Sequence, residues 1–170
     1  AMALADAVGI PQVAQLTVLR SFTGLAHRCQ FVRDVNGVRW INDSKATNVG
    51  STLAAVAGVG ESVQGRLWLL AGGQGKGQDF SPLQPLPANQ IYRMVCFGQD
   101  AGILMELADN TQRVADLDEA VRSVAAEVQP GDWVLLAPAC ASLDQFRNFE
   151  QRGQRFADIR DLAALQPDRL

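Results

Sequence analysis

The sequence has little from which a disulfide framework or a metal centre could be built. Its three cysteines, Cys29, Cys96 and Cys140, form no CxxC pair and lack the spacing of zinc ligands. An odd, scattered set of this kind is typical of a reducing compartment, which predicts a cytoplasmic protein. A single histidine and dispersed carboxylates offer no recognisable ligand pattern. We therefore predict no metal site in this chain.

Long apolar runs and a surplus of basic charge are also missing. Apolar runs such as residues 67–71 and 133–137 fall far short of the length that crosses a bilayer, and the first residues lack the basic start of a signal peptide. The 15 Lys and Arg residues against 18 Asp and Glu residues leave a net charge of -3, without a basic stripe. We expect neither a membrane nor a nucleic acid as a partner.

The pattern of the chain indicates an α/β fold. The 170 residues suffice for one domain with a buried core. Helical patterns alternate with apolar strand candidates, and this alternation predicts a Rossmann-like, mostly parallel sheet flanked by helices. Asn36-Gly37 predicts an antiparallel hairpin at the N-terminal end of this sheet. The predicted strands are residues 29–35, 38–41, 66–71, 92–97 and 133–137, and the predicted helices are 48–57, 101–108, 116–128 and 143–165.

Two features indicate how the chain is organised. Residues 1–8 and a segment opened by Pro11 are typical of two short helices, and strand-like patterns replace the helical ones from about His27. We therefore divide the chain into residues 1–26 and a main domain of residues 27–170. Residues 133–137 are apolar without alternation, which predicts a central strand covered on both faces.

Polar and glycine-rich segments follow four of the predicted strands. They are residues 42–48, 72–77, 98–100 and 138–142. Ligands of open parallel sheets bind at the carboxyl ends of the strands, so these segments are the candidate site.

The glycine-rich segment could be an ordinary loop or a ligand-binding turn. It is not a phosphate-binding P-loop, because Leu70 and Gly77 stand where that motif needs Gly and Ser or Thr, and Phe80 breaks a GxGxxG pattern. Lys76 is therefore better suited to a carboxylate.

The segment of residues 42–48 also has two interpretations. Ser44, Thr47 or Asn48 could simply cap a helix. Lys45 fits poorly at a helix N-terminus, where a cation is disfavoured, and so favours an anionic ligand nearby.

A nucleophile is a weaker hypothesis for the last segment. Cys140 and Ser142 lie close together, with His27 as the sole histidine base. No GxSxG elbow surrounds them, so we do not favour nucleophilic catalysis.

Taken together, five blocks resemble the Mur ligase family, in particular its D-glutamate-adding members. The resemblance extends over residues 1–163. The blocks are His27-Arg28, residues 40–48 (WINDSKATN), 72–76 (GGQGK), 138–146 (PACASLDQF) and 149–153 (FEQRG). Gln30 and Ala137 depart from the family pattern, which often has glutamate and serine there.

The resemblance implies an ATP-dependent, amide-forming ligase of peptidoglycan precursor and cell wall synthesis. Residues 1–26 would end the central ATP-binding domain, and residues 27–170 would form the C-terminal glutamate-binding domain. ATP, D-glutamate and UDP-N-acetylmuramoyl-L-alanine would be the substrates and magnesium the cofactor, with the phosphate loop and magnesium ligands in the missing central part. We expect a monomer, and a fragment of this extent to be inactive alone.

The same resemblance implies roles for individual residues. Lys45 would lie at the reacting groups, and Arg28 and Asp43 would contact ATP. The residues implied for D-glutamate are Thr47, Lys76, Ser142, Leu143, Asn148 and Phe149. Two alternatives stay open: a stand-alone module that binds a small carboxylate, and a family member that adds L-lysine or diaminopimelate. The compact pair of Lys76 and Ser142 favours glutamate.

Overall fold

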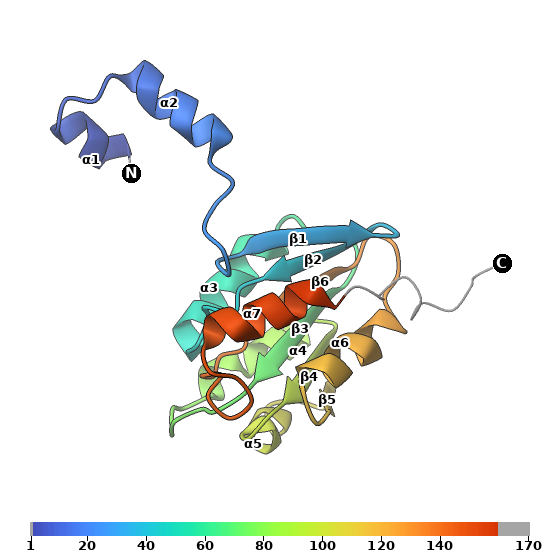
Figure 1. The fold of residues 1–170 in the computed structure, drawn as a ribbon. Helices are drawn as coiled ribbons and strands as arrows, with labels where there is room; N and C mark the ends of the chain where they lie inside the picture. Colours follow the sequence, from blue (N-terminus) through green and yellow to red (C-terminus); the bar gives the residue numbers. More distant parts are fainter. Residues whose placement is uncertain (1, 160–170) are drawn as a thin grey trace.

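A computed structural model gives the fold, and residues 2–159 are described, apart from the side chains of Pro87 and Ala88. Figure 1 shows a helical pair followed by a sheet with helices on both faces. The helices are α1 (Met2–Ala7), α2 (Gln12–Ser21), α3 (Val49–Gly60), the 3-10 helix η1 (Ser81–Leu83), α4 (Pro85–Asn89), α5 (Ala101–Met105), α6 (Leu117–Ala125) and α7 (Phe149–Asp158). The strands are β1 (Gln30–Val35), β2 (Val38–Asn42), β3 (Leu67–Gly72), β4 (Arg93–Phe97), β5 (Thr111–Arg113) and β6 (Trp133–Leu136).

The six strands form one sheet in the order β1-β2-β6-β3-β4-β5. β1 and β2 pair in antiparallel fashion, and the other pairs are parallel. Asn36 and Gly37 join the hairpin with φ values of 53° and 77°, the left-handed conformations that a tight hairpin turn requires. The predicted fold class and hairpin are confirmed, and β6 lies inside the sheet as its apolar sequence indicated.

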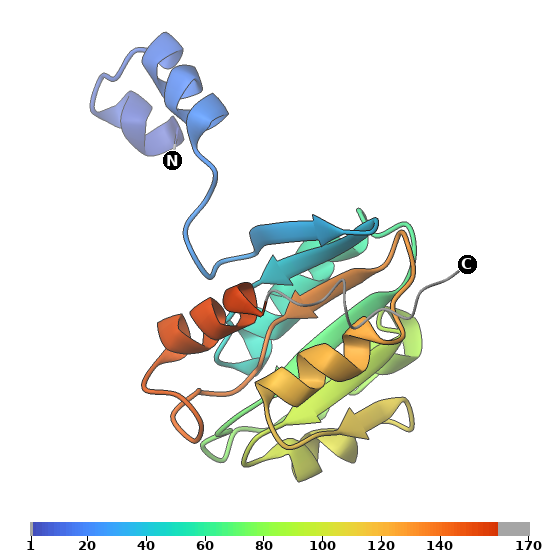
Figure 2. The same ribbon diagram turned by 45° about the vertical axis from the view of Figure 1, so that its right-hand side comes forward.

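The core consists of two layers because successive strand side chains point to opposite faces. On β3, Leu69 packs with α3, α4 and α5, whereas Trp68 and Leu70 pack with α6 and α7. Figure 2 shows α6 and α7 over one face of the sheet. Asp116 caps α6 by accepting the Glu119 amide at 2.8 Å, as its sequence position predicts.

One predicted helix is shorter than its sequence pattern indicates. The phenylalanine spacing predicts a helix over residues 143–165, but α7 begins at Phe149 because Asn148 caps it by accepting the Gln151 amide at 2.8 Å. Residues 143–148 instead form turns, with the Phe146 amide bonded to the Ser142 carbonyl. Residues 160–165 lie outside the described residues. The sequence pattern missed β5, α4 and η1, all of which are short.

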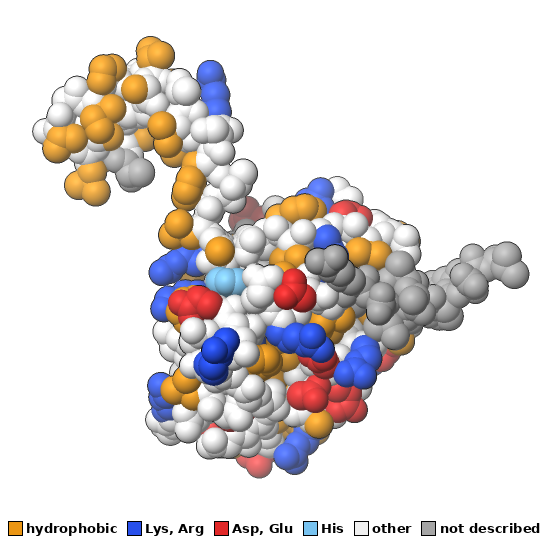
Figure 3. Space-filling view, viewed as in Figure 1, with side chains coloured by type: hydrophobic (Ala, Val, Ile, Leu, Met, Phe, Trp, Pro, Cys, Tyr) orange, Lys and Arg blue, Asp and Glu red, His pale blue; other side chains and the backbone are white. Residues whose placement is uncertain are grey.

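The helical pair α1–α2 stands away from the sheet, and residues 22–26 connect it to the main domain (Figure 2). Both helices were predicted. Their apolar side chains are largely exposed, and Figure 3 shows hydrophobic side chains gathered over this part. Those more than half exposed are Leu4 of α1 and Val13 and Val18 of α2. Within residues 2–159, none of the helices combines the length and apolarity that a membrane span requires.

A buried carboxylate joins the amino-terminal ends of two central strands. Asp132 lies just before β6 with only 2% of its surface exposed. It accepts hydrogen bonds from Arg66 Nη2 at 2.7 Å and Trp68 Nε1 at 3.1 Å. Burial acts to raise the pKa of Asp132, but the hydrogen bonds it accepts, first of all from Arg66, outweigh burial and hold the pKa below its usual value.

Replacing this carboxylate tests the network. Asp132→Ala should lower the free energy of unfolding at neutral pH by about 3 kcal/mol, because Arg66 loses its buried partner. Since the folded pKa is lowered, the carboxylate stabilises the fold above the unfolded pKa of about 3.9, and this contribution is lost as the pH falls through the folded value. Chemical denaturation over a pH series should show the difference from wild type shrinking in acid.

The matched control is Asp109→Ala, which removes an exposed aspartate just before β5. It should change the free energy of unfolding by less than about 0.5 kcal/mol. A difference between D132A and wild type that grows as the pH falls would contradict this account.

Candidate functional site

The four candidate segments lie at one edge of the sheet, because β2, β6, β3 and β4 all run parallel. Counted from the observed strand ends, they are loop 43–48, loop 73–77, turn 98–100 and loop 137–148, and Asn42 and Gly72 of the predicted segments end β2 and β3. Main-chain hydrogen bonds join neighbouring segments: Ala139 N donates to Ala46 O at 2.9 Å, and Gly72 N donates to Pro138 O at 2.8 Å. Asp100 N donates to Gly73 O at 3.0 Å and links turn 98–100 as well, so the four strand-end segments predicted as a site are connected.

Loop 73–77 is fixed against loop 137–148 by a two-residue bridge. Gln74 N donates to Ala141 O at 2.8 Å, and Ala141 N donates to Gln74 O at 2.9 Å. A Cβ on Gly73, where φ is 121°, would lie 2.2 Å from Ala141 O, so only glycine allows this approach. The bridge brings the segment that carries Lys76 next to the segment that carries Ser142, as expected for two adjacent strand ends.

Arg152 of α7 forms hydrogen bonds at the carboxyl ends of three strands. Its side chain is fully buried. The guanidinium donates to Ser44 O at 2.9 Å, to Cys140 O at 3.1 Å and to Gly72 O at 3.4 Å. Its Nε also donates to the Ser44 hydroxyl at 3.0 Å. One planar side chain thus sets the spacing between the ends of β2, β3 and β6.

The charge of Arg152 also matters for a ligand. Burial lowers its pKa to about 10, so the side chain stays a cation at neutral pH. The acceptors of its hydrogen bonds are carbonyl and hydroxyl oxygens, which are neutral. The Asp144 carboxylate lies close enough for its charge to act on Arg152 and offsets part of the positive potential. The remainder favours an anion at the loop edge.

A second buried polar group joins α7 to the end of β2. Asn42 Nδ2 donates to Gly153 O at 3.0 Å and lies 3.0 Å from His27 Nδ1, while Asn42 Oδ1 accepts the Ser44 amide at 3.1 Å. A Cβ on Gly153 would lie 2.2 Å from His27 Nδ1. His27, which has no role from the sequence, therefore packs between loop 43–48 and α7.

Lys45 of loop 43–48 and Phe149 of α7 lie together. The Lys45 ammonium is 4.1 Å from the centroid of the Phe149 ring, a cation–π contact. The Ser44 hydroxyl donates to the Phe149 carbonyl at 2.7 Å. Thr47 follows on the same loop, where its amide donates to Lys45 O at 2.8 Å.

Arg28 and Asp43, the two residues implied for ATP, are also neighbours. Asp43 is half-buried and accepts a hydrogen bond from Cys29 Sγ at 3.4 Å. Burial raises the pKa of Asp43, and the Cys29 hydrogen bonds and the Arg28 charge oppose this only in part. Burial likewise raises the pKa of Cys29 to about 11.

Two predicted residues have a less specific setting. The Asn148 side chain caps α7, so its oxygen is engaged by the Gln151 amide. Leu143 is 58% exposed on a turn. The ligand roles of all nine predicted residues remain predictions.

Sequence reasoning gave no individual role to Arg152, or to Asn42 and Asp100, which lie in two of the candidate segments. A signal existed for Arg152, which occupies the buried face of α7 between Phe149 and Phe156, where apolar residues are expected. Asn42 ends a strand whose other buried residues are apolar.

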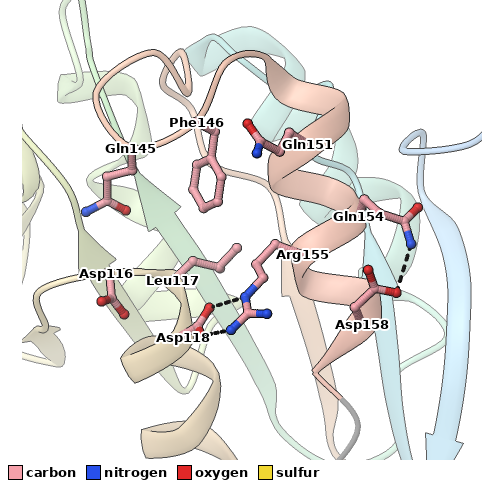
Figure 4. A pocket seen from close by; sticks show the side chains of 9 residues that line it. All are labelled: Asp116, Leu117, Asp118, Gln145, Phe146, Gln151, Gln154, Arg155 and Asp158. Atoms are coloured by element: carbon pink, nitrogen blue, oxygen red, sulfur yellow. Dashed lines mark hydrogen bonds and ion pairs between the residues drawn. The ribbon is translucent and has the colours of Figure 1, made fainter.

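A surface cavity of about 640 Å³ lies elsewhere, between α6 and α7 (Figure 4). Its lining contains none of the predicted site residues. Arg155 pairs with Asp118, and Gln154 donates to Asp158 at 2.9 Å, so these polar groups are engaged with one another. The lining residues are Asp116, Leu117, Asp118, Gln145, Phe146, Gln151, Gln154, Arg155 and Asp158.

Over the described part of the chain, no three His, Cys, Asp or Glu side chains gather to hold a metal.

Arg152→Lys tests the role of the guanidinium in the loop edge. A lysine keeps the charge but cannot reach three loops with one ammonium, so the free energy of unfolding should fall by about 2 kcal/mol. Amide NMR should show shifts at Ser44, Gly72 and Cys140. Arg155→Lys, one turn away and exposed, is the control and should change stability by less than about 0.5 kcal/mol. Unmoved amides in R152K would contradict the proposed link.

Known proteins resemble this chain in sequence. A family model described as Mur ligase, glutamate ligase domain, matches residues 27–140. The chain is 55% identical over 163 residues to the UDP-N-acetylmuramoylalanine--D-glutamate ligase of Pectobacterium atrosepticum, and 57% identical over 160 residues to that of Salmonella typhimurium. Each alignment covers 94% of this chain and 36% of the relative. The chain therefore spans about a third of the length of these curated relatives.

Solved structures agree in fold. The MurF ligase of Thermotoga maritima in complex with ADP aligns with a TM-score of 0.68 at 15% identity, over 96% of this chain and 37% of that chain. The UDP-N-acetylmuramate-alanine ligase of Thermotoga maritima gives 0.67 at 16% identity, over 92% and 35%. At such identities the likeness concerns the fold alone. Together with the family model, these comparisons confirm the resemblance seen in the sequence: the chain belongs to the Mur ligase family, and residues 27–140 are its glutamate ligase domain.

Proposed function

We propose that this chain is the D-glutamate-binding part of an ATP-dependent ligase that joins D-glutamate to UDP-N-acetylmuramoyl-L-alanine in the cytoplasm. The observation that carries the proposal is the connected loop edge with two lysines, Lys45 and Lys76, above the buried Arg152 cation. The names of the most similar relatives point to the same reaction. Peptidoglycan precursor synthesis is the process this implies.

The loop edge suits a dicarboxylate. Lys76 is exposed on loop 73–77, and Ser142 lies across the Gln74–Ala141 bridge. An ammonium and a hydroxyl supply the donors that carboxylate oxygens need, and the Arg152 potential adds to their attraction. We assign Thr47 and Phe149 to the same pocket, with Leu143 and Asn148 at its margin.

The nucleotide would lie on the side of loop 43–48. Arg28 is exposed and suits a phosphate, and Asp43 suits a ribose hydroxyl. Lys45 is held against the Phe149 ring. In the sequence it lies between Asp43, which we assign to ATP, and Thr47, which we assign to D-glutamate. We therefore assign Lys45 to the reacting groups.

In the proposed reaction, ATP converts the alanyl carboxylate of the precursor to an acyl phosphate, the D-glutamate amine attacks its carbonyl, and phosphate leaves. The contribution of this domain is to hold the amine in position and to exclude water that would hydrolyse the acyl phosphate. Magnesium is the cofactor that the family implies, and we assign its ligands to the central domain.

We propose that α1 and α2 end the central ATP-binding domain. Their exposed apolar side chains are suited to packing against a larger body. The rival interpretation is a stand-alone module that binds a small carboxylate. A GxxxxGK[ST] motif upstream in the full reading frame favours the ligase, and its absence there favours the module.

The direct test is steady-state kinetics of the full-length protein. Product formation should require ATP, the UDP-linked precursor and D-glutamate, with L-glutamate as the control substrate. Lys76→Ala should raise KM for D-glutamate about 30-fold, since a charged hydrogen bond is lost, and leave KM for ATP unchanged. Arg113→Ala, which removes an exposed cation at the end of β5, is the matched control.

The outcomes separate two errors. If wild type forms no product that depends on D-glutamate, the proposed function is wrong. If wild type is active but K76A keeps its KM for D-glutamate, the assignment of Lys76 is wrong.

Residues 1–170 alone should release no ADP with the full set of substrates.

A further inference from the structure

Turn 98–100 is the one segment of the loop edge that the proposed function leaves without a role. It follows β4, and its Asp100 stands at the N-cap position of α5. An aspartate there ordinarily accepts an amide of its own helix, as Asp116 does for α6 at 2.8 Å. Asp100 makes no such cap within the described structure. Instead its Oδ2 accepts the Gly75 amide at 2.6 Å.

Asp100 therefore acts across the edge, on the loop that carries Lys76. The main chain of the turn holds the start of that loop, where Asp100 N donates to Gly73 O at 3.0 Å. The side chain holds Gly75, one residue before Lys76. A Cβ on Gly75 would lie 2.7 Å from the Phe80 ring and 3.2 Å from Asp100 Oδ2, so the loop lies close against both.

The residue after this contact has an unfavourable backbone. Lys76 has a φ of 55°, a left-handed conformation that costs a residue with a Cβ about 1 kcal/mol. Such a conformation persists only where its surroundings impose it. The Asp100–Gly75 hydrogen bond fixes the preceding residue, and so fixes the direction in which Lys76 leaves the loop.

The turn is also tied to the other side of the pocket. Gln99 N donates to Asp144 Oδ2 at 2.9 Å, and Asp144 is two residues after Ser142. A Cβ on Gly98 would lie 2.4 Å from the same Asp144 oxygen. Turn 98–100 thus contacts loop 73–77 and loop 137–148, which carry Lys76 and Ser142.

The negative charge of Asp100 does not favour D-glutamate binding, because a protein carboxylate near the site repels a dicarboxylate ligand. What the Asp100 side chain contributes is an acceptor for the Gly75 amide.

We infer that Asp100 is a positioning residue for D-glutamate, which holds the Gly75 amide and thereby directs Lys76 toward the ligand. The inference rests on the proposed function. It assigns Asp100 no contact with the substrate and no part in the chemical step.

The test is kinetics of the full-length ligase with Asp100→Ala and Asp100→Asn. D100A should raise KM for D-glutamate about tenfold, which corresponds to about 1.4 kcal/mol, with kcat and KM for ATP within about twofold of wild type. D100N keeps an acceptor in place and removes the charge, so its KM should stay at or below the wild-type value. Asp116→Ala, which loses a real cap, should destabilise the domain without changing KM.

A double-mutant cycle identifies the route of the effect. If Asp100 acts through Lys76, D100A should add little to the KM of K76A, so the two effects should not be additive. Additive effects, a D100N variant as weak as D100A, or an unchanged KM in D100A would each overturn the inference. A wild-type enzyme without activity that depends on D-glutamate would instead overturn the proposed function.

Discussion

The Arg152 guanidinium lies where the ends of β2, β3 and β6 converge, and the rest of the site depends on it. A buried cation is costly unless its donors are used. Here they bond to Ser44, Gly72 and Cys140, each of which belongs to or borders a different strand-end loop. The same contacts that make the burial tolerable therefore fix the distance between the loops. The positive charge then becomes available to an anionic ligand at the edge above.

Sheet topology explains why so many functional segments meet there. β2, β6, β3 and β4 are parallel, so their polar ends lie at one edge, whereas the apolar strands between the two helical layers are buried. The opposite edge has a structural role instead, with Asp132 joining β6 to Arg66 and β3. The protein thus separates the network that stabilises the sheet from the loops that would bind ligands.

Much of this could be predicted from the sequence because the signals are local. Asn36-Gly37 specifies its own turn, Asp116 caps the helix next to it, and the unbroken apolar run of β6 reports burial on two faces. The strand-end segments follow from the strands. Arg28 and Asp43, both chosen for ATP from the resemblance, lie near each other, and Lys45 contacts Phe149, while their ligand roles stay predictions.

The parts that could not be predicted depend on contacts distant in sequence. The phenylalanine spacing suggested a helix from residue 143, but the Asn148 cap and the turn at Ser142 override it. Arg152 and Asp100 each act on loops far along the chain. A residue that looks like a helix cap in the sequence, such as Asp100, reveals its partner only in three dimensions.

The central claim is that the loop edge binds D-glutamate, and ligand titration followed by amide NMR tests it most directly. Millimolar D-glutamate added to the labelled protein, with L-glutamate as the control, should move the amide signals of Gly73 to Lys76, Ser142 and Phe149, and L-glutamate should leave them in place. If neither enantiomer moves these signals, in this chain or in the full-length protein with nucleotide bound, the loop edge is not a D-glutamate site.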